Sequence, residues 1–306
     1  MTAAPDRTAP IGGRESPNVP SIKVSLTGVT ETLLIPLLGR VLDAEAEHPI
    51  LGDAHAKEVI RKLEYDFAKL PVPPTHATGV ALRTSLYDGW TTSFLSRHTR
   101  ATVLHLACGL DSRNQRVKWT SPDVRWIDVE LPEVVAIRRQ VLPTTLSGQD
   151  YQLIEADITD AAWLEDIPTD RPVLVIMEGL ISYLREDEGR SLITRLVSKL
   201  KEGELHFDCM NTTVLKASNK PGEIAVSRTG TTFQWAVDDP KSLEDIHPRL
   251  RMLEIIRYLD LAPGVGQFGW QTRASLYLLS WLPSLRDSVR FVRFGFSAER
   301  FVQPSR

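Results

Sequence analysis

Acidic side chains follow four apolar stretches of the sequence at the point where each stretch ends. Asp111 follows "VLHLACGL", Asp128 and Glu130 follow "VRWI", Asp157 follows "YQLIEA" and Glu178 follows "VLVIM". Carboxylates accept hydrogen bonds and do not donate them, so they suit a ligand that is rich in hydroxyl groups or positively charged. A phosphate-rich ligand fits them poorly. Any one of them is equally well explained as part of a solvated loop, but four in corresponding places favour a binding site.

The glycine in "ACGLDS" indicates that a ligand approaches the backbone, because Gly109 has no Cβ to block it. The motif is not G-x-G-x-x-G, so a nicotinamide or flavin dinucleotide lacks its usual phosphate-binding turn. An acidic residue beyond the second stretch can accept hydrogen bonds from both ribose hydroxyls, and Asp157 lies where an adenine amino group can donate to it. We therefore expect an adenosyl ligand without phosphates, namely S-adenosylmethionine, whose sulfonium cation also suits an acidic site.

Strands and helices alternate through the middle of the chain, which indicates βαβ units and a parallel sheet. Ligands of such sheets bind at the carboxyl ends of the strands, where the acidic residues fall. Strand regions in "LRMLEIIRYLDL" and "SVRFVRFGF" extend the prediction to a Rossmann-like, mostly parallel seven-stranded α/β sheet. The first five strands are predicted at Thr102–Ala107, Val124–Asp128, Gln152–Ala156, Val173–Met177 and Glu204–Asp208, with helices from about Ser112, from about Pro132, near Asp160–Asp166 and at Glu186–Lys201.

The pattern divides the chain into three parts. Residues 1–21, rich in Pro, Gly and Ala, are predicted to be a disordered tail. Residues 22–100 are predicted to be an N-terminal helical region, with Asp53 as a helix N-cap and a last helix from Thr78 to His98. Residues 101–306 form the core. Within it, a polar segment at about 211–250 is too long for a plain loop and is interpreted as a cap inserted over the sheet.

The composition is that of an ordinary globular protein of 306 residues, with 42% apolar residues and a formal net charge of −3. No basic stripe stands out, so nucleic acid is not expected as a partner. Cys108 and Cys209 lie in no C-x-x-C arrangement, so we expect no disulfide and no metal site, and a cytoplasmic location. No apolar run approaches the ~20 residues of a membrane helix. The sequence does not indicate an oligomeric state.

Four motifs, in this order, resemble the leucine carboxyl methyltransferase family, including its bacterial and fungal polyketide O-methyltransferase branch. They are "VLHLACGLDSR", "DVELPEVV", "EADITDAAW" and "MEGLISYL". Upstream, "SLTGVTETLL" and "LEYDF" resemble the polyketide branch. The resemblance runs from about Val24 to Asp208, and more weakly to Phe296. It implies a class I S-adenosylmethionine-dependent methyltransferase.

The resemblance also implies which residues hold the cofactor. Arg83 corresponds to the family arginine that pairs with the methionine carboxylate, a task suited to a bidentate guanidinium; without the resemblance it is a surface helix arginine. Lys23 corresponds loosely to a family lysine at the same carboxylate, the alternative being a tail residue without a partner. Gly109 matches the motif glycine. Glu130 stands where the family has Asp and is expected to bind the ribose, with Asp128 retained as a second candidate.

Three further cofactor contacts follow from the same motifs. Asp157 and Ile158 match the acidic–aliphatic pair that frames adenine, and Glu178 matches the acidic residue after the fourth strand. Cys108 is expected to be a small buried side chain.

The acceptor is expected next to the methyl donor, where we place Tyr183 of "EGLISYL" as a catalytic contact. His206 in "ELHFDCM" is interpreted as structural, but it becomes the candidate catalytic base if the acceptor is a phenol. The expected acceptor-binding residues are Tyr183, Asn211, Trp235 and Trp270, together with Phe233 and His247 of the cap segment.

These features predict an S-adenosylmethionine-dependent O-methyltransferase of secondary metabolism, which methylates a carboxylate or hydroxyl of a small, aromatic, polyketide-like acceptor. A carboxylate is already ionised at neutral pH and needs no base, so the lack of a recognisable catalytic pair does not argue against this function. The alternatives are a protein C-terminal carboxyl methyltransferase and a non-catalytic partner protein with the same fold. A nicotinamide-dependent dehydrogenase is the least favoured.

Overall fold

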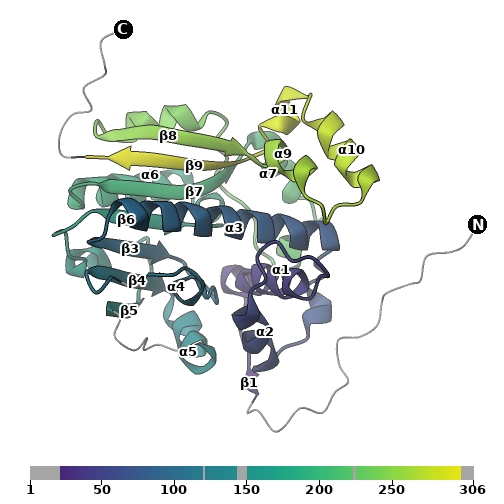
Figure 1. Ribbon diagram of the computed structural model, residues 1–306, viewed down its shortest axis with the longest axis horizontal. Coiled ribbons are helices and arrows are strands. Elements are labelled where there is room, and N and C mark those ends of the chain that lie inside the picture. Colours follow the sequence, from purple (N-terminus) through teal and green to yellow (C-terminus); the bar gives the residue numbers. More distant parts are fainter. Residues whose placement is uncertain (1–20, 120, 143–149, 223–224, 298–306) are drawn as a thin grey trace, which may run out of the picture.

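The computed structural model describes residues 21–119, 121–142, 150–222 and 225–297 (Figure 1). The predicted tail at 1–21 lies outside these ranges except for its last residue. Seven strands form one sheet in the order β5-β4-β3-β6-β7-β9-β8. The pairs from β5 to β7 are parallel, and β9 runs antiparallel to both β7 and β8. This confirms the predicted fold class. The strands are β3 (Ala101–Leu106), β4 (Val124–Glu130), β5 (Asp150–Glu155), β6 (Val173–Met177), β7 (Gly203–Met210), β8 (Leu250–Arg257) and β9 (Val289–Phe296).

The predicted helices of the βαβ units are present, but their lengths differ. The helix expected from Ser112 is reduced to α4 (Arg113–Arg116), whose side chains form ion pairs in place of a long packed face. The other connecting helices are α5 (Pro132–Val141), η3 (Ala162–Asp166), η4 (Ile181–Tyr183) and α6 (Glu186–Lys199). Of these, α5 begins at a proline, which suits the first turn of a helix.

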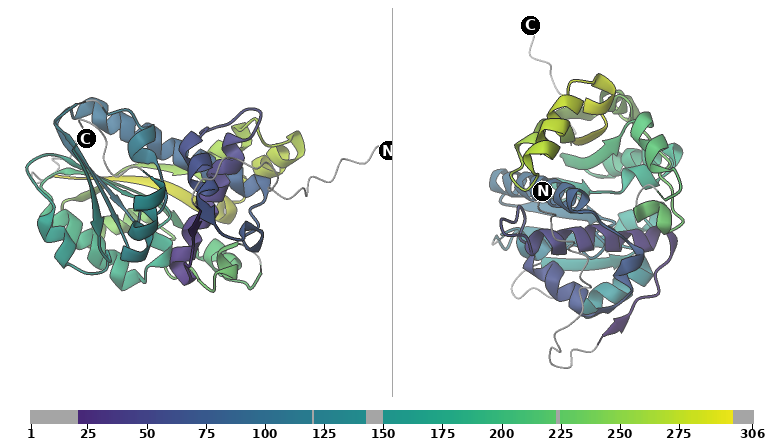
Figure 2. Two further views of the ribbon diagram at one scale, coloured as in Figure 1. Left: turned by 90° about the horizontal axis from the view of Figure 1, so that it is seen from below. Right: turned by 90° about the vertical axis from the view of Figure 1, so that its right-hand side faces the viewer.

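Helices cover both faces of the sheet (Figure 2). The long helix α3 (Pro74–Arg97) packs Tyr87, Trp90 and Phe94 against one face. Apolar residues of α6, including Leu192 and Leu196, pack against the other. Strand side chains alternate between these two layers, as a period of two requires.

An N-terminal unit covers the carboxyl ends of the strands. Leu34 and Leu37 of α1 form one buried cluster with Leu110, which follows β3. Asp53 accepts a hydrogen bond from the backbone N–H of Ala56, which confirms it as the N-cap of α2. The elements of this unit are β1 (Ile22–Lys23), η1 (Gly28–Leu33), α1 (Leu34–Ala44), α2 (Ala54–Arg61), β2 (Leu63–Glu64) and η2 (Phe67–Lys69).

The segment interpreted as a cap holds three short helices, and four more lie between β8 and β9 near the C-terminus. In the described part of the chain, every helix is too short or too polar to cross a membrane. The cap helices are α7 (Thr212–Ser218), α8 (Ala225–Arg228) and η5 (Pro240–Ile246); the later helices are α9 (Tyr258–Leu261), η6 (Ala262–Gly264), α10 (Trp270–Leu279) and α11 (Pro283–Arg286).

Candidate active site

A cavity of about 850 Å³ lies at the carboxyl edge of the sheet. The strand order reverses at β3, and the crevice at such a switch point is where open α/β sheets bind ligands. One residue from the end of each of five successive parallel strands lines this cavity. These residues are Gly109 after β3, Glu130 at the end of β4, Asp157 after β5, Glu178 after β6 and Asp208 near the end of β7.

The turn after β3 presents its backbone to the cavity. Ala107 and Gly109 have φ angles of 49° and 51°, in the left-handed region that a non-glycine residue rarely adopts. The Gly109 N–H donates to Glu130 Oε2 at 2.7 Å, and the Arg138 guanidinium donates to the Gly109 carbonyl at 2.9 Å. The turn is therefore held from both sides. A Cβ on Gly109 would lie only 3.3 Å from the Leu33 Cβ, so the missing side chain lets Leu33, which also lines the cavity, pack against the turn.

Glu130 and Asp157 both keep free acceptor capacity toward the cavity. Glu130 accepts the N–H groups of Gly109 and Leu131, but a carboxylate has about four lone-pair sites. Burial raises the pKa of Glu130. Among the described residues, Asp157 accepts hydrogen bonds only through Oδ1, from the backbone N–H and the hydroxyl of Thr159. Ile158 lines the cavity beside it and is buried.

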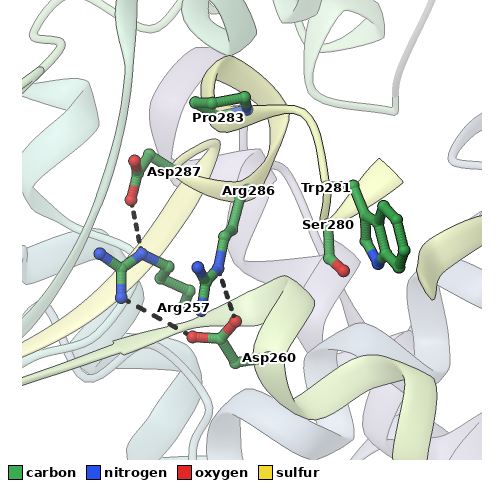
Figure 3. Close-up of a pocket in the computed structure, with 7 residues that line it drawn as sticks. All are labelled: Arg257, Asp260, Ser280, Trp281, Pro283, Arg286 and Asp287. Atoms are coloured by element: carbon green, nitrogen blue, oxygen red, sulfur yellow. Dashed lines mark hydrogen bonds and ion pairs between the residues drawn. The ribbon is translucent and has the colours of Figure 1, made fainter. Parts of the chain in front are cut away.

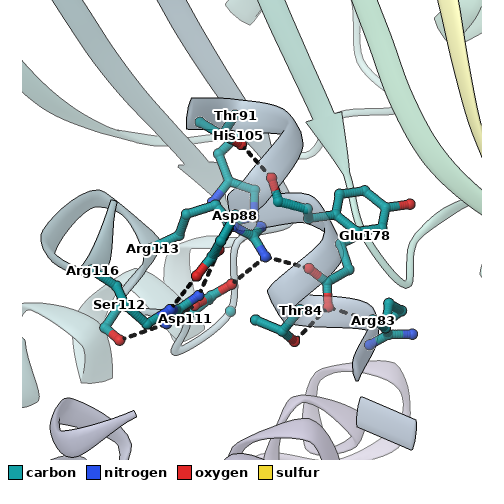
Figure 4. A network of polar contacts seen from close by, with 12 residues as sticks. Arg83, Thr84, Asp88, Thr91, His105, Asp111, Ser112, Arg113, Arg116 and Glu178 are labelled. Atoms are coloured by element: carbon teal, nitrogen blue, oxygen red, sulfur yellow. Dashed lines mark hydrogen bonds and ion pairs between the residues drawn. The ribbon is translucent and has the colours of Figure 1, made fainter. Parts of the chain in front are cut away.

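Glu178 lies in a network of charged side chains (Figure 4). It accepts from Arg83 Nε at 2.9 Å, from the Thr84 hydroxyl at 3.0 Å and from Arg113 at 2.5 Å. Burial alone would raise its pKa, but Arg113 and Arg83 outweigh burial and lower the pKa to about 2. Glu178 is therefore ionised and fixes the direction of Arg83.

Arg83 and Asp208 meet at the middle of the cavity. Arg83 Nη1 lies 3.5 Å from Asp208 Oδ2, and Asp208 Oδ1 accepts the Gly179 N–H at 2.6 Å. Among the described residues, the second terminal nitrogen of Arg83 has no hydrogen-bond partner, so it is available to a carboxylate. Sequence reasoning missed Asp208, although it is a fifth acidic residue at the end of a predicted strand. Burial raises its pKa.

Tyr183 and Phe233 come together at the cavity wall, with their rings 4.9 Å apart. Tyr183 is in η4, and Phe233 belongs to the cap segment. Burial raises the pKa of Tyr183 to about 12, and the nearby Thr32 hydroxyl only partly offsets this. The phenol is therefore neutral at physiological pH. Cys108 is buried in the same wall, as expected.

The structure corrects the placement of Asp128 and His206. Asp128 is fully buried within β4 and accepts from Arg138, Trp126 and Tyr151, so it does not reach the cavity. His206 is fully buried and faces α3. Its Nε2 lies 2.8 Å from Glu204, and its ring packs on Trp90. Since His206 does not line the cavity, it is not retained as a candidate base.

Four other predicted contacts also lie outside the cavity. Lys23 is exposed on β1, away from the cavity lining. Asn211 caps α7, where its side chain accepts a backbone N–H. Trp235 is buried against Gly189, so close that a Cβ on this glycine would lie 2.1 Å from the indole. Trp270 is 77% exposed. These four are corrected from ligand contacts to surface, capping and packing residues.

His247 lies at the end of η5, where its ring accepts the backbone N–H of Arg249. It is not part of the cavity lining either.

A second hollow, of about 480 Å³, lies between α9 and α11 (Figure 3). The charged side chains that line this hollow form ion pairs with one another. Arg257 Nε lies 2.6 Å from Asp287 Oδ1, and Arg286 Nε lies 3.0 Å from Asp260 Oδ1. None of the carboxylates at the ends of β3 to β7 lines this hollow, so we assign the site to the larger cavity, which they do line.

The sheet order, with one antiparallel strand beside the parallel ones, and the carboxylate-lined cavity define a class I methyltransferase fold. The chain belongs to the leucine carboxyl methyltransferase family, whose sequence profile matches residues 34–197. It is an S-adenosylmethionine-dependent methyltransferase, and the acidic cavity with its bare glycine turn fits that cofactor.

Two relatives extend over most of the chain. The tetracenomycin polyketide synthesis O-methyltransferase TcmP of Streptomyces glaucescens is 38% identical over 89% of this chain and 98% of its own. The S-adenosyl-L-methionine-dependent methyltransferase dpfgK of Gibberella zeae is 36% identical over 85% and 92%. A candidate methyltransferase from Thermobifida fusca, solved by crystallography, has a TM-score of 0.54 at 17% identity, covers 85% of this chain and 95% of its own, and supports the fold.

The variant Glu130→Ala is expected to weaken cofactor binding by roughly 1–3 kcal/mol, the range for a buried hydrogen-bonding partner that is lost. Titration calorimetry with S-adenosylhomocysteine measures the change. Glu133→Ala is the matched control, because Glu133 is exposed on α5 and lies outside the cavity. An unchanged dissociation constant for Glu130→Ala would remove this residue from the cofactor site.

Proposed function

We propose that this enzyme methylates an oxygen, either carboxylate or hydroxyl, of a small, aromatic, polyketide-like acceptor in secondary metabolism. The observation that carries the proposal is the division of the cavity into a charged end and an apolar end. The name of the 38% identical relative, a polyketide synthesis O-methyltransferase, supports the same class of acceptor.

The two ends of the cavity follow the order of the strands. Gly109, Glu130 and Asp157 lie at the ends of β3, β4 and β5. On the other side of Asp208, the cavity is lined by Met210 and Val289, which are paired neighbours on β7 and β9. Further apolar residues of this end are Val80 of α3, Val214 of α7 and Phe233 of the cap segment.

The volume of the cavity suits a cofactor together with a small acceptor. Pockets for a single drug-sized ligand are about 300–1,000 Å³, and about 850 Å³ lies near the top of that range. The apolar lining favours an acceptor with a largely apolar, ring-shaped body, because burial of apolar surface supplies its binding free energy.

S-adenosylmethionine supplies, when bound, an electrophilic methyl group on a sulfonium. In the proposed site, Arg83 holds its carboxylate, Glu130 its ribose, and Asp157 with Ile158 its adenine. Glu178 keeps the Arg83 guanidinium in place. The acceptor-side residues hold the attacking oxygen in line with the methyl carbon, and such positioning accounts for much of the acceleration in displacement reactions.

Incubation of the protein with methyl-labelled S-adenosylmethionine and an extract of its own organism tests the proposal. We expect the label in a small apolar product. Treatment with alkali then distinguishes the acceptor atom, because alkali cleaves a methyl ester and leaves a methyl ether intact. Label only in protein-sized material would contradict the proposal and indicate methylation of a protein carboxylate.

The variant Tyr183→Phe is expected to alter kcat while leaving the affinity for S-adenosylhomocysteine nearly unchanged. Its ring packs on Phe233 at the cavity wall, and its neutral hydroxyl lies near the Thr32 hydroxyl. Steady-state kinetics and calorimetry together check this. Turnover equal to that of the wild type would show that the Tyr183 hydroxyl does not take part.

A further inference from the structure

The face of α3 that lines the cavity carries one imidazole. His76, Val80 and Arg83 have the spacing i, i+4, i+7, which places them on one side of a helix, and all three line the cavity. Arg83 lies beside Asp208 at the middle of the cavity. His76 is about two helical turns toward the N-terminal end of α3 from Arg83.

A tyrosine reaches the same part of α3 from the far edge of the sheet. Tyr258 follows β8 and lines the cavity. Its hydroxyl lies over Gly79, where a Cβ would be only 3.3 Å from the Tyr258 oxygen. Gly79 is one turn from His76 on the same helix, so the two polar side chains flank one region of the apolar end.

At this apolar end of the cavity, the polar atoms of both side chains are unpaired among the described residues. Within the described ranges, neither the His76 ring nor the Tyr258 hydroxyl has a hydrogen-bond partner in the protein. By contrast, His105 is 3.5 Å from Asp128 and 3.4 Å from Arg113. Unpaired polar groups that line a cavity are free to bind a ligand.

In both groups, the cavity favours the uncharged form. Burial and the positive charge of Arg83 lower the pKa of His76. Burial raises the pKa of Tyr258. A neutral imidazole both donates and accepts a hydrogen bond, and so does a phenol. This pair therefore matches a neutral polar group better than it matches an anion.

We propose that His76 and Tyr258 determine acceptor specificity by hydrogen-bonding a neutral hydroxyl or carbonyl on the ring system of the acceptor. This rests on the proposed function, which it deepens by naming a second polar group that the acceptor must carry. The pair recognises the acceptor at the apolar end of the cavity, and the methylated oxygen lies toward the charged end.

A matched pair of probes tests the inference in the full-length protein saturated with S-adenosylhomocysteine. The probes are 2-naphthol and 2-methylnaphthalene, which differ in one hydroxyl, and their fluorescence reports binding. We expect the wild type to prefer 2-naphthol by about fivefold to tenfold, the value of roughly one hydrogen bond. His76→Ala and Tyr258→Phe should each reduce this preference, and the double variant should abolish it.

The controls are His48→Ala and Tyr277→Phe, since the His48 side chain is 88% exposed and Tyr277 is 54% exposed on α10. Both should keep the preference, and all variants should bind S-adenosylhomocysteine like the wild type. A wild type that does not discriminate between the probes, fails to bind either of them, or keeps its preference in the double variant would overturn the inference. A labelled product formed with unchanged KM by the double variant would overturn it while leaving the proposed function intact.

Discussion

Replacing Arg113 with methionine is expected to reduce the free energy of unfolding by about 3–5 kcal/mol, the usual effect of removing one partner from a buried ion pair. The Arg113 side chain is 0% exposed and donates to Glu178 at 2.5 Å and to Asp88 at 2.7 Å (Figure 4). It also lies 3.4 Å from Asp111. Methionine has a similar volume but leaves these buried carboxylates without their shared cation. Urea unfolding, followed by circular dichroism, measures the difference.

Arg190→Met is the matched control for Arg113→Met. The Arg190 side chain on α6 is 41% exposed and pairs with Glu186 four residues earlier, and such surface pairs contribute about 0–1 kcal/mol. If Arg113→Met unfolds at the same urea concentration as this control, the charged network contributes nothing measurable to stability. Arg113 would then be a packing residue.

Asp111, in the "GLDSR" part of the first motif, shows that the sequence reveals the position of a site residue but not its charge partners. Asp111 follows the strand as predicted and lines the cavity, but its carboxylate is paired with Arg113 and Arg116. Arg116 also binds Asp88, which lies on α3 more than twenty residues upstream. A local sequence pattern places a charge at the end of a strand. It does not tell a free carboxylate from one that an arginine neutralises.

The strand ends were predictable because their signals are local. Predicted strand regions of five or six residues fix the order of the elements, and the residues that end or follow each region must lie at the carboxyl edge of a parallel sheet. This logic places Gly109, Glu130, Asp157 and Glu178 at one cavity, where the structure has them. It applies equally to Asp208, at the end of the predicted strand Glu204–Asp208.

The different positions of His206 and Asp208 have a simple geometric reason. They are two residues apart on β7 and therefore face the same side of the sheet. His206 lies deeper in the strand and is enclosed by Trp90 of α3, whereas Asp208 is one step nearer the carboxyl edge and reaches the cavity. The direction of a strand side chain follows from periodicity, but its depth depends on where the covering helix lies.

Apart from Tyr183 and Phe233, the proposed acceptor side was not predictable from the sequence, because its residues come from segments far apart in the chain. His76 comes from α3, Val214 from the cap segment and Tyr258 from the end of β8, and no motif links them. Trp235 was predicted to bind the acceptor as part of the cap segment, and Trp270 as part of the glycine-rich stretch "GVGQFGWQT". One is a packing residue and the other a surface residue.

Replacing Arg83 with methionine is expected to weaken binding of S-adenosylhomocysteine by about 2–5 kcal/mol, the usual effect of truncating one partner of a buried charge pair. The Arg83 side chain is 22% exposed at the cavity, and its orientation is fixed by Glu178. Lysine at this position keeps the charge but lacks the planar fork, so Arg83→Lys should lie between the wild type and Arg83→Met. Titration calorimetry measures the dissociation constant of S-adenosylhomocysteine for the wild type and both variants.

A loss of cofactor affinity in Arg83→Met must be separated from a loss of structure, because Arg83 also pairs with Glu178 and Asp208. Glu178 keeps Arg113 as a partner, so most of the network remains and the variant should fold. Arg97→Met is the matched control, since Arg97 lies on the same helix and pairs with Glu204, outside the cavity. If both variants bind S-adenosylhomocysteine like the wild type, Arg83 does not hold the methionine carboxylate. Its role would then be confined to neutralising the two acidic residues at the ends of β6 and β7.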